Sequence, residues 1–364
     1  MPSPVLALHA DLVRIPSLSH DERAAADFVE RHARASAAPV EVGRLDDNVW
    51  VSLGDGDDVL LLASHLDVVP PSAEHPYPPF EPIVVDGKVY GRGAVDAKAS
   101  GAAMLQALLD LAAEGFRPAG RIVVSLTACE ETGGSYNGLD HLQREVFGSA
   151  LPPVSAAIIG EPTELRPCLA QKGLLILTAT AHGRTAHAAR AHLGTNALTV
   201  AARDLLTVDG FAFDKSDPLL GAPTVTATVI EGGSAKNVVP DRCTFTLDVR
   251  STPAYTHADL AALFRDTLES EVAVYSDRLV PCRTAPDARI AQAAASALTD
   301  LGLDPTPFGS PTASDWVFVH DVPAVKLGPG RSELSHTAEE HVEIAQLTRA
   351  VEVYRQIIRH YFAR

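Results

Sequence analysis

The chain has 364 residues, 46% hydrophobic and 21% charged, which is the composition of a globular protein with room for one large domain or two ordinary ones. Its formal net charge of −16 disfavours nucleic acid or an anionic membrane as partner, because both require a positive surface. No apolar stretch approaches the roughly 20 residues that span a bilayer, and the N-terminus does not resemble a signal peptide. Four scattered cysteines without a CxxC pair fit a reducing compartment, so we expect a cytoplasmic protein.

Helical and strand patterns alternate in the N-terminal part of the chain. Apolar residues at helical spacing predict a helix over 5–14, and Ser19 with Glu22 resembles a capping box that opens a second helix over 21–35. Short apolar runs bounded by turn residues predict buried strands. These strands cover 40–42, 48–53, 59–64, 121–128 and 154–159, with a helix over 98–111 between them.

The pattern changes near residue 172 and changes back after Pro286. Alternating strands and two helices follow one another in the order β-α-β-β-α-β, which is that of a ferredoxin-like unit. We therefore expect an α/β protein in which an inserted α+β domain, residues 172–276, interrupts a larger mixed-sheet domain formed by 1–171 and 277–364. The expected elements are strands 174–181, 225–230, 243–250 and 272–275 with helices 196–206 and 257–271, and then helix 287–301, strand 322–327 and helix 343–361.

Polar side chains that can bind metal stand at the ends of the apolar runs. Open α/β sheets place their sites at strand ends, and several converging acids would repel one another unless cations held them. The set therefore predicts a metal centre, with two metals favoured over one. Its members are His65 and Asp67 after strand 59–64, Asp96 at a strand-to-helix turn, Glu130 and Glu131 after strand 121–128, Glu161 after strand 154–159, and His336 near the last strand.

Residue types and spacing suggest roles within this set. Imidazole and carboxylate suit Zn²⁺ and its first-row neighbours, and the lack of thiolates disfavours a structural zinc site. His65 and Asp67 share one face of an extended strand tip, so His65 can bind a metal while Asp67 fixes its other nitrogen. Of the adjacent acids Glu130 and Glu131, one can bind metal while the other exchanges a proton with water and a leaving amine.

Each of these residues also has an ordinary explanation. Asp96 can be a helix N-cap, and His336 a histidine of a surface loop. The adjacent acids after strand 121–128 can form a solvated acidic loop. Cys129 is interpreted as a small buried residue rather than a nucleophile, because no histidine follows at the spacing of a catalytic triad. The metal hypothesis depends on all of these residues lying at strand ends together.

The combined motifs resemble the dinuclear zinc amidohydrolases that include acetylornithine deacetylase, succinyl-diaminopimelate desuccinylase, aminoacylase-1 and glutamate carboxypeptidase. The resemblance extends over essentially the whole chain. The matching stretches are SHLDVVP at 64–70, YGRGAVDAK at 90–98, EETG at 130–133, GEPT at 160–163, and GPG at 328–330 followed by SHT at 335–337.

The resemblance implies a role for each member of the site. Two divalent metals, zinc, cobalt or manganese, would be bound, and Asp67 would orient a ligand histidine. Glu130 would take a proton from a water acidified by the metals and return it to the departing amine. The metal ligands would be His65 and Glu161 on one metal, Glu131 and His336 on the other, and Asp96 between them.

The inserted domain resembles the dimerisation domain of this family, which implies a homodimer. His187 matches a histidine that reaches across the dimer to the carbonyl oxygen of the substrate, although a surface histidine cluster with His182 and His192 would look the same. Asn237, Arg250 and Gly330 match positions that hold the substrate. Arg250 suits a carboxylate, because a guanidinium can donate two parallel hydrogen bonds.

The implied substrate is a small N-acyl amino acid. The chain length and the run from 326 to 340 look most like acetylornithine deacetylase of arginine biosynthesis. Asp315 would then meet the cationic side chain of N-acetylornithine, or else cap the following helix. Cys129 stands where these enzymes more often carry an acid. N-acetylcitrulline, N-acetyllysine, a carrier-protein-linked lysine, succinyl-diaminopimelate and short peptides stay open as substrates. A catalytically silent dimeric metal-binding homologue is the non-enzyme alternative, and the full set of site residues disfavours it.

Overall fold

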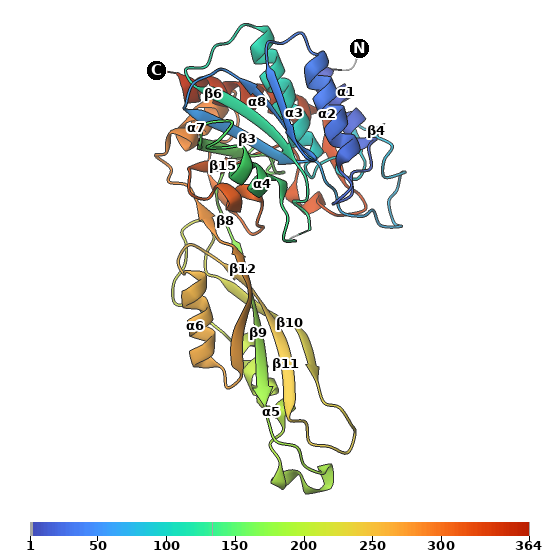
Figure 1. The fold of residues 1–364 in the computed structure, drawn as a ribbon, viewed down its shortest axis with the longest axis vertical. Coiled ribbons are helices and arrows are strands. Elements are labelled where there is room, and N and C mark those ends of the chain that lie inside the picture. Colours follow the sequence, from blue (N-terminus) through green and yellow to red (C-terminus); the bar gives the residue numbers. More distant parts are fainter. Residues whose placement is uncertain (1–2, 133, 364) are drawn as a thin grey trace. The chain divides into compact units, whose positions relative to one another are not determined.

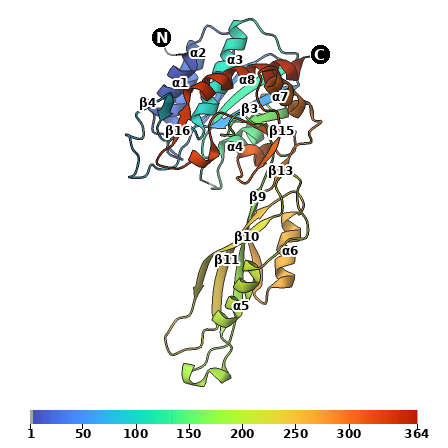
Figure 2. The ribbon, with the colours of Figure 1, turned by 180° about the vertical axis from the view of Figure 1, so that it is seen from behind.

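The computed structural model describes residues 3–132 and 134–363, and the chain divides into two compact units. Unit 1 consists of Met1–Leu169, Thr284–Phe308 and Ser314–Arg364, and unit 2 of Ala170–Arg283 and Gly309–Ala313. Figure 1 and Figure 2 show the course of the chain through both units.

A large mixed sheet forms the centre of unit 1, as expected for a mixed α/β fold. Its strand order is β1-β2-β6-β3-β7-β15-β8. The pairs β3–β6, β3–β7 and β7–β15 are parallel, whereas β1–β2 and β2–β6 are antiparallel. The strands are β1 (Glu41–Leu45), β2 (Asn48–Leu53), β3 (Val59–His65), β6 (Arg121–Thr127), β7 (Val154–Ile159), β8 (Cys168–Gln171) and β15 (Ala324–Lys326).

The central strands are apolar runs because helices and neighbouring strands cover them on all sides. Every residue of β3 is buried, which is typical of a parallel strand in the middle of a sheet. Helix α3 (Lys98–Ala113) packs against β3 and β6, and α1 (Pro4–Val13) and α8 (Ile344–Phe362) pack against α3 (Figure 1). The small N-terminal residues of α3, such as Ser100 and Gly101, are fully buried and allow this close approach.

Further elements complete unit 1. Helix α2 (Arg23–Ala35) contacts β1 and β2, α4 (Gly138–Glu145) contacts β2 and β6, and α7 (Arg289–Asp300) packs on α8. A small antiparallel sheet has the order β16-β5-β4. Its strands are β4 (Ile83–Val85), β5 (Lys88–Tyr90) and β16 (His341–Glu343), and short 3-10 helices cover η2 (Asp315–Val319) and η3 (Ser332–Leu334).

Unit 2 has the expected ferredoxin-like order and an antiparallel sheet in the order β10-β11-β9-β12. Apolar side chains of the sheet and of both helices form its core, for example Leu177, Phe245 and Phe264. The elements are β9 (Gly173–His182), η1 (Ala188–Leu193), α5 (Ala197–Asp209), β10 (Thr224–Gly232), β11 (Arg242–Ser251), α6 (His257–Thr267) and β12 (Glu271–Leu279). The short strands β13 (Cys282–Arg283) and β14 (Phe308–Ser310) pair with β8.

Two local expectations of the sequence analysis are wrong. Helix α2 begins at Arg23, and no side-chain hydrogen bond caps it. Ser19 instead donates a hydrogen bond to Asp67, and Glu22 accepts one from the backbone N–H of Cys129, so the residues that resemble a capping box bind distant segments. The strand expected before Asp96 is only the short β5, which ends at Tyr90, and the strands β4 and β16 and the helix α4 are missing from the expectation, because runs this short carry little periodicity. Across the described ranges, no helix is long and apolar enough to cross a bilayer.

Candidate metal centre

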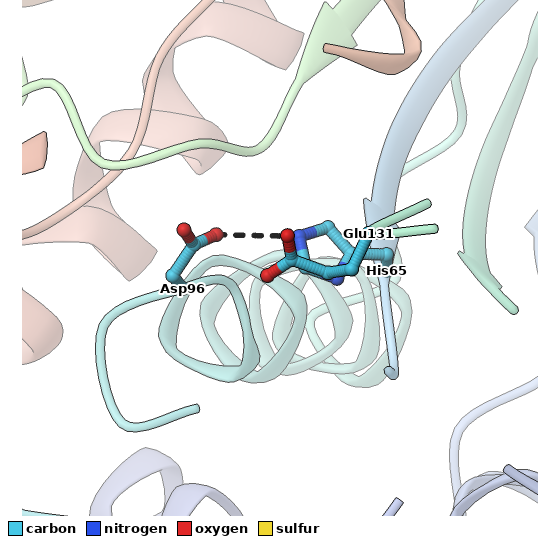
Figure 3. A group of neighbouring side chains, drawn as sticks. All are labelled: His65, Asp96 and Glu131. Atoms are coloured by element: carbon cyan, nitrogen blue, oxygen red, sulfur yellow. Dashed lines mark hydrogen bonds and ion pairs between the residues drawn. The ribbon is translucent and has the colours of Figure 1, made fainter. Parts of the chain in front are cut away.

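Side chains from three separate segments meet at the ends of β3 and β6 and at the start of α3. His65, Asp96 and Glu131 each offer one ligand atom, and these atoms lie within 4.8 Å of one another. Figure 3 shows the carboxylate of Asp96 directed toward the imidazole of His65, with the side chain of Glu131 close to both. Because β3 and β6 are parallel neighbours, their carboxyl ends lie at the same edge of the sheet. The topology therefore explains why residues far apart in sequence converge.

Asp96 stands between two histidines. Its Oδ1 lies 3.3 Å from Nε2 of His65, and its Oδ2 lies 3.5 Å from Nε2 of His336. Oε2 of Glu131 lies 2.9 Å from Nε2 of His336, and Oε1 of Glu161 lies 3.9 Å from Nε2 of His65. The ligands predicted from sequence thus form two groups, His65 with Glu161 and His336 with Glu131. One oxygen of Asp96 faces the histidine of each group.

The tautomer of His65 suits metal binding through Nε2. Its Nδ1 lies 2.9 Å from the backbone carbonyl oxygen of Asp67, and 3.5 Å from the Oδ1 of the same residue. A carbonyl oxygen can only accept, so Nδ1 carries a proton and Nε2 is left to face Asp96. The residue expected to orient His65 does lie beside it, but its nearest atom is the main-chain oxygen.

Side chains from three other segments hold the backbone of the acidic turn after β6. The Asn48 side chain accepts a hydrogen bond from the N–H of Ala128 at 2.9 Å, and Glu22 accepts one from Cys129 at 3.0 Å. Asp67 accepts from the next two N–H groups, those of Glu130 and Glu131, at 3.0 and 3.1 Å. Four consecutive N–H groups are therefore satisfied by side chains, which fixes the direction of the two acids. Sequence reasoning missed Asn48, and took Glu22 for a helix cap.

The electrostatics of the site indicate an excess of negative charge. Burial and the nearby carboxylate of Asp96 raise the pKa of Glu161 to about 8. Burial also raises the pKa of Glu130 well above its ordinary value, with contributions from the charges of Glu161 and Asp315. Burial alone would lower the pKa of His65, but hydrogen bonds with Asp67 and Asp96 raise it well above its usual range. In the absence of cations, Glu161, Glu130 and His65 therefore tend to keep their protons, whereas bound cations would favour the deprotonated forms.

These residues fit divalent cations. Neutral imidazole and carboxylate oxygen are the donor types that zinc, cobalt and manganese accept, and the donors come from rigid strand ends and a helix start. A thiol also lies close, that of Cys129, but burial and the charge of Glu22 raise its pKa to about 12. Its Sγ contacts Glu22 and His20 instead, so it stays a protonated thiol rather than a ligand.

Two further predicted site residues of unit 1 make contacts that sequence could not show. Asp315 is buried, with Oδ1 accepting from the Asn137 side chain at 2.7 Å and Oδ2 from Thr127 at 3.4 Å. The expected encounter of Asp315 with a substrate cation stays a prediction. Gly330 donates its N–H to the Gln346 side chain, and its positive φ of 87° suits glycine. A Cβ at Gly330 would lie 2.1 Å from a methyl group of Val95, next to Asp96.

The predicted substrate residues of unit 2 lie in two places. His187 forms an isolated bridge with Val238, and the N–H of Ala188 donates to the carbonyl of Asn237 at 2.9 Å, so His187 and Asn237 are neighbours. Arg250 lies near the far end of β11, eight residues beyond Arg242, and forms a bidentate ion pair with Asp248. Arg242 begins β11 and follows Asn237 by only five positions, so it marks the end of the sheet near His187 and Asn237. At about 3.3 Å per residue, Arg250 lies roughly 26 Å from Arg242 along the strand.

The fold and the donor set define a metallo-hydrolase. The chain belongs to the Peptidase family M20/M25/M40, which matches residues 61–360. Succinyl-diaminopimelate desuccinylase of Rhodospirillum centenum is 30% identical over 383 residues, covering 100% of this chain and 98% of that relative. The family confirms the hydrolase class and the mixed α/β fold that the sequence predicts.

Solved structures of similar proteins share this fold. Aminopeptidase PepT from Bacillus cereus has a TM-score of 0.80 at 21% identity, with 98% of each chain covered. The YXEP protein of Bacillus subtilis, a dinuclear metal binding peptidase from the M20 family, has a TM-score of 0.74 at 16% identity, with 97% of this chain and 96% of that chain covered.

Proposed function

We propose that this protein hydrolyses the amide bond of a small N-acyl amino acid with the help of two divalent cations. The position of Asp96 is the observation that carries the proposal. Its two oxygens face His65 and His336 at 3.3 and 3.5 Å, as a carboxylate shared between two cations would. Glu161 would complete the first group and Glu131 the second. The metal would be zinc, with cobalt and manganese as alternatives.

The cations, when bound, would lower the pKa of a water and polarise the amide carbonyl. Glu130 is the group that moves protons. The charges of His65, Glu161 and Glu131 act on its carboxyl group, and its backbone N–H donates a hydrogen bond to Asp67. Its side chain is therefore held near the proposed ligands, although it is not itself a proposed ligand. It would accept the proton of the water and donate it to the departing amine. A raised pKa suits a group that must be both base and acid near neutral pH.

N-succinyl-diaminopimelate is the first candidate substrate. The expectation of N-acetylornithine rested on chain length and on the run from 326 to 340, whereas the desuccinylase relative is similar over the whole chain. The charge distribution of unit 2 supports an anionic acyl group. The exposed segment that carries His187 also carries Arg184 and Arg190, and it pairs with the segment of Lys236, in a chain whose net charge is −16.

The placement of the proposed substrate residues in unit 2 supports a homodimer. His187 and Asn237 lie at one end of the sheet and Arg250 near the other, so unit 2 of one chain does not surround a substrate with all of them. We infer that His187 and Asn237 serve the metal centre of a second copy. Strand β10 is an edge strand that exposes Val229 and Ile230, an apolar edge of the kind that a second copy would cover.

The test is amine release from N-acyl substrates by the zinc- or cobalt-loaded enzyme. The panel holds N-succinyl-diaminopimelate, N-acetylornithine, N-acetylcitrulline, N-acetyllysine and a dipeptide, with Glu130→Gln as the matched control. We expect the succinyl substrate to have the highest kcat/KM and the control to lose about 10²–10⁴-fold. Preference for another member would keep the mechanism and change the substrate. Two bound metals without any turnover would favour the silent homologue.

A further inference from the structure

A buried ion pair lies directly behind the metal centre. Arg92 and Glu340 are 2% and 1% exposed, and Nη1 of Arg92 lies 2.5 Å from Oε2 of Glu340. They are 248 positions apart in the chain. Taking two charges out of water is costly, so a pair of this kind needs further partners for the remaining donors and acceptors. Those partners are the backbones of two predicted metal ligands.

The second carboxylate oxygen of Glu340, which does not pair with Arg92, holds the turn that carries Asp96. Its Oε1 accepts hydrogen bonds from the N–H groups of Val95 and Asp96, at 3.1 and 3.2 Å. The N–H of Gly91, at the start of the same turn, donates to the carbonyl of Glu340 at 3.2 Å. Asp96 is therefore fixed from behind through its main chain, which leaves both of its carboxylate oxygens to face the histidines.

Arg92, the other member of the ion pair, holds the backbone of His336. Nη2 of Arg92 donates to the backbone carbonyl of His336 at 3.2 Å. His336 has a φ of 65°, which a residue with a Cβ adopts only when its surroundings impose it. Its side chain is about half exposed, so packing alone does not hold it. The guanidinium joins Glu340 and His336 through two different nitrogens, Nη1 and Nη2, whose relative positions are fixed by its rigid fork.

We propose that Arg92 and Glu340 are positioning residues that set the spacing between Asp96 and His336, and that occupancy of the cation position formed by Glu131 and His336 depends on them. This inference rests on the proposed dinuclear centre. The other position is anchored differently, since His65 extends from a buried central strand and is fixed by Asp67. Loss of the pair should therefore affect the two cations unequally.

The experiment measures the binding of Zn²⁺ to the metal-free, full-length protein by competition with a chromophoric chelator. The variants are Glu340→Gln and Arg92→Lys. The first removes the charge of the acceptor, and the second keeps the positive charge but loses the fork. We expect one of the two cations to be held within about threefold of the parent, and the other, assigned to Glu131 and His336, to bind about 10–100-fold less tightly. The absorption spectrum of the Co²⁺-loaded variants should change from that of two sites to that of one.

Glu269→Gln is the matched control, because it breaks the exposed bidentate pair of Arg203 and Glu269 on unit 2. It should leave both affinities unchanged. A lower melting temperature of the metal-free Arg92→Lys protein with both affinities intact would overturn the inference and leave only a structural role. If Glu340→Gln does not fold, the two Zn²⁺ affinities of Arg92→Lys test the inference. A parent protein that binds fewer than two cations would instead refute the dinuclear centre itself.

Discussion

Oδ1 of Asp67 accepts a hydrogen bond from the backbone N–H of Glu130 at 3.0 Å, so the proposed proton carrier is aimed by a buried carboxylate. Oδ2 of the same residue accepts from Glu131 at 3.1 Å and from the Ser19 hydroxyl at 2.7 Å. Asp67 also supplies the carbonyl next to Nδ1 of His65. One residue thus connects a proposed ligand histidine, a proposed ligand acid and the acid proposed to move protons.

Asp67→Asn should lower kcat about 10–100-fold. An amide has one acceptor oxygen, so its NH₂ group must face either the N–H of Glu130 or that of Glu131, and the turn is displaced. Steady-state kinetics with metal analysis of the same samples is the measurement. Ser19→Ala removes only the hydroxyl donor and should change kcat less than threefold. Equal effects of the two substitutions would show that the acceptor role does not matter.

Glu22 offers a second test of the same turn, because a single oxygen makes its contacts. Its Oε1 accepts from the N–H groups of His20 and Cys129, both at 3.0 Å. Glutamine keeps such an oxygen and alanine does not. Glu22→Gln should therefore stay within about threefold of the parent kcat, while Glu22→Ala loses about 10–100-fold.

Both Glu22 variants are checked by kinetics beside a thermal melt. Glu30→Gln in α2 serves as control, because the Glu30 side chain pairs with Arg34 and Arg44 rather than with the acidic turn. A kcat loss that glutamine and alanine share equally would mean that the charge of Glu22, rather than its acceptor oxygen, is what matters.

The candidate site could be located from sequence because the proposed ligands follow apolar runs, as His65, Glu131 and Glu161 do. Parallel strands then bring these ends to one edge. The supporting residues could not be found in the same way. Glu22 followed Ser19 at the spacing of a helix cap, and nothing in the sequence singled out Glu340 within the run from 326 to 340. Only the tertiary structure pairs an acid with the N–H groups of a turn about 100 or more positions away.

Metal binding should strengthen as pH rises toward 8. Burial and Asp96 raise the pKa of Glu161 to about 8, and the pKa of His336 is raised by its hydrogen bond with Glu131. Glu161 therefore holds its proton at neutral pH in the metal-free protein, and the hydrogen bond with Glu131 favours the protonated form of His336. Both groups must be deprotonated to bind a cation. The metal affinity rises with pH, because a higher pH removes the protons that compete with the metal. Calorimetry in two buffers of different ionisation enthalpy at pH 7 measures the protons released.

Glu161→Gln provides the comparison for this pH dependence. It should release fewer protons and show a shallower rise of affinity between pH 6 and 8, although it binds more weakly throughout. An affinity of the parent protein that does not change over this range would contradict the raised pKa of Glu161 as the controlling feature.

His187→Ala should reduce kcat far more than metal content, since His187 is placed in unit 2 and offers no ligand atom to the described metal cluster. A hybrid dimer makes the test decisive. His187→Ala and Glu130→Gln subunits are each inactive alone, but a hybrid contains one site with Glu130 intact and His187 supplied by the partner subunit. Unfolding and refolding a one-to-one mixture should restore about a quarter of parental activity, because half of randomly formed dimers are hybrids with one intact site each. A refolded dimeric mixture as inactive as its components would mean that His187 acts within its own chain.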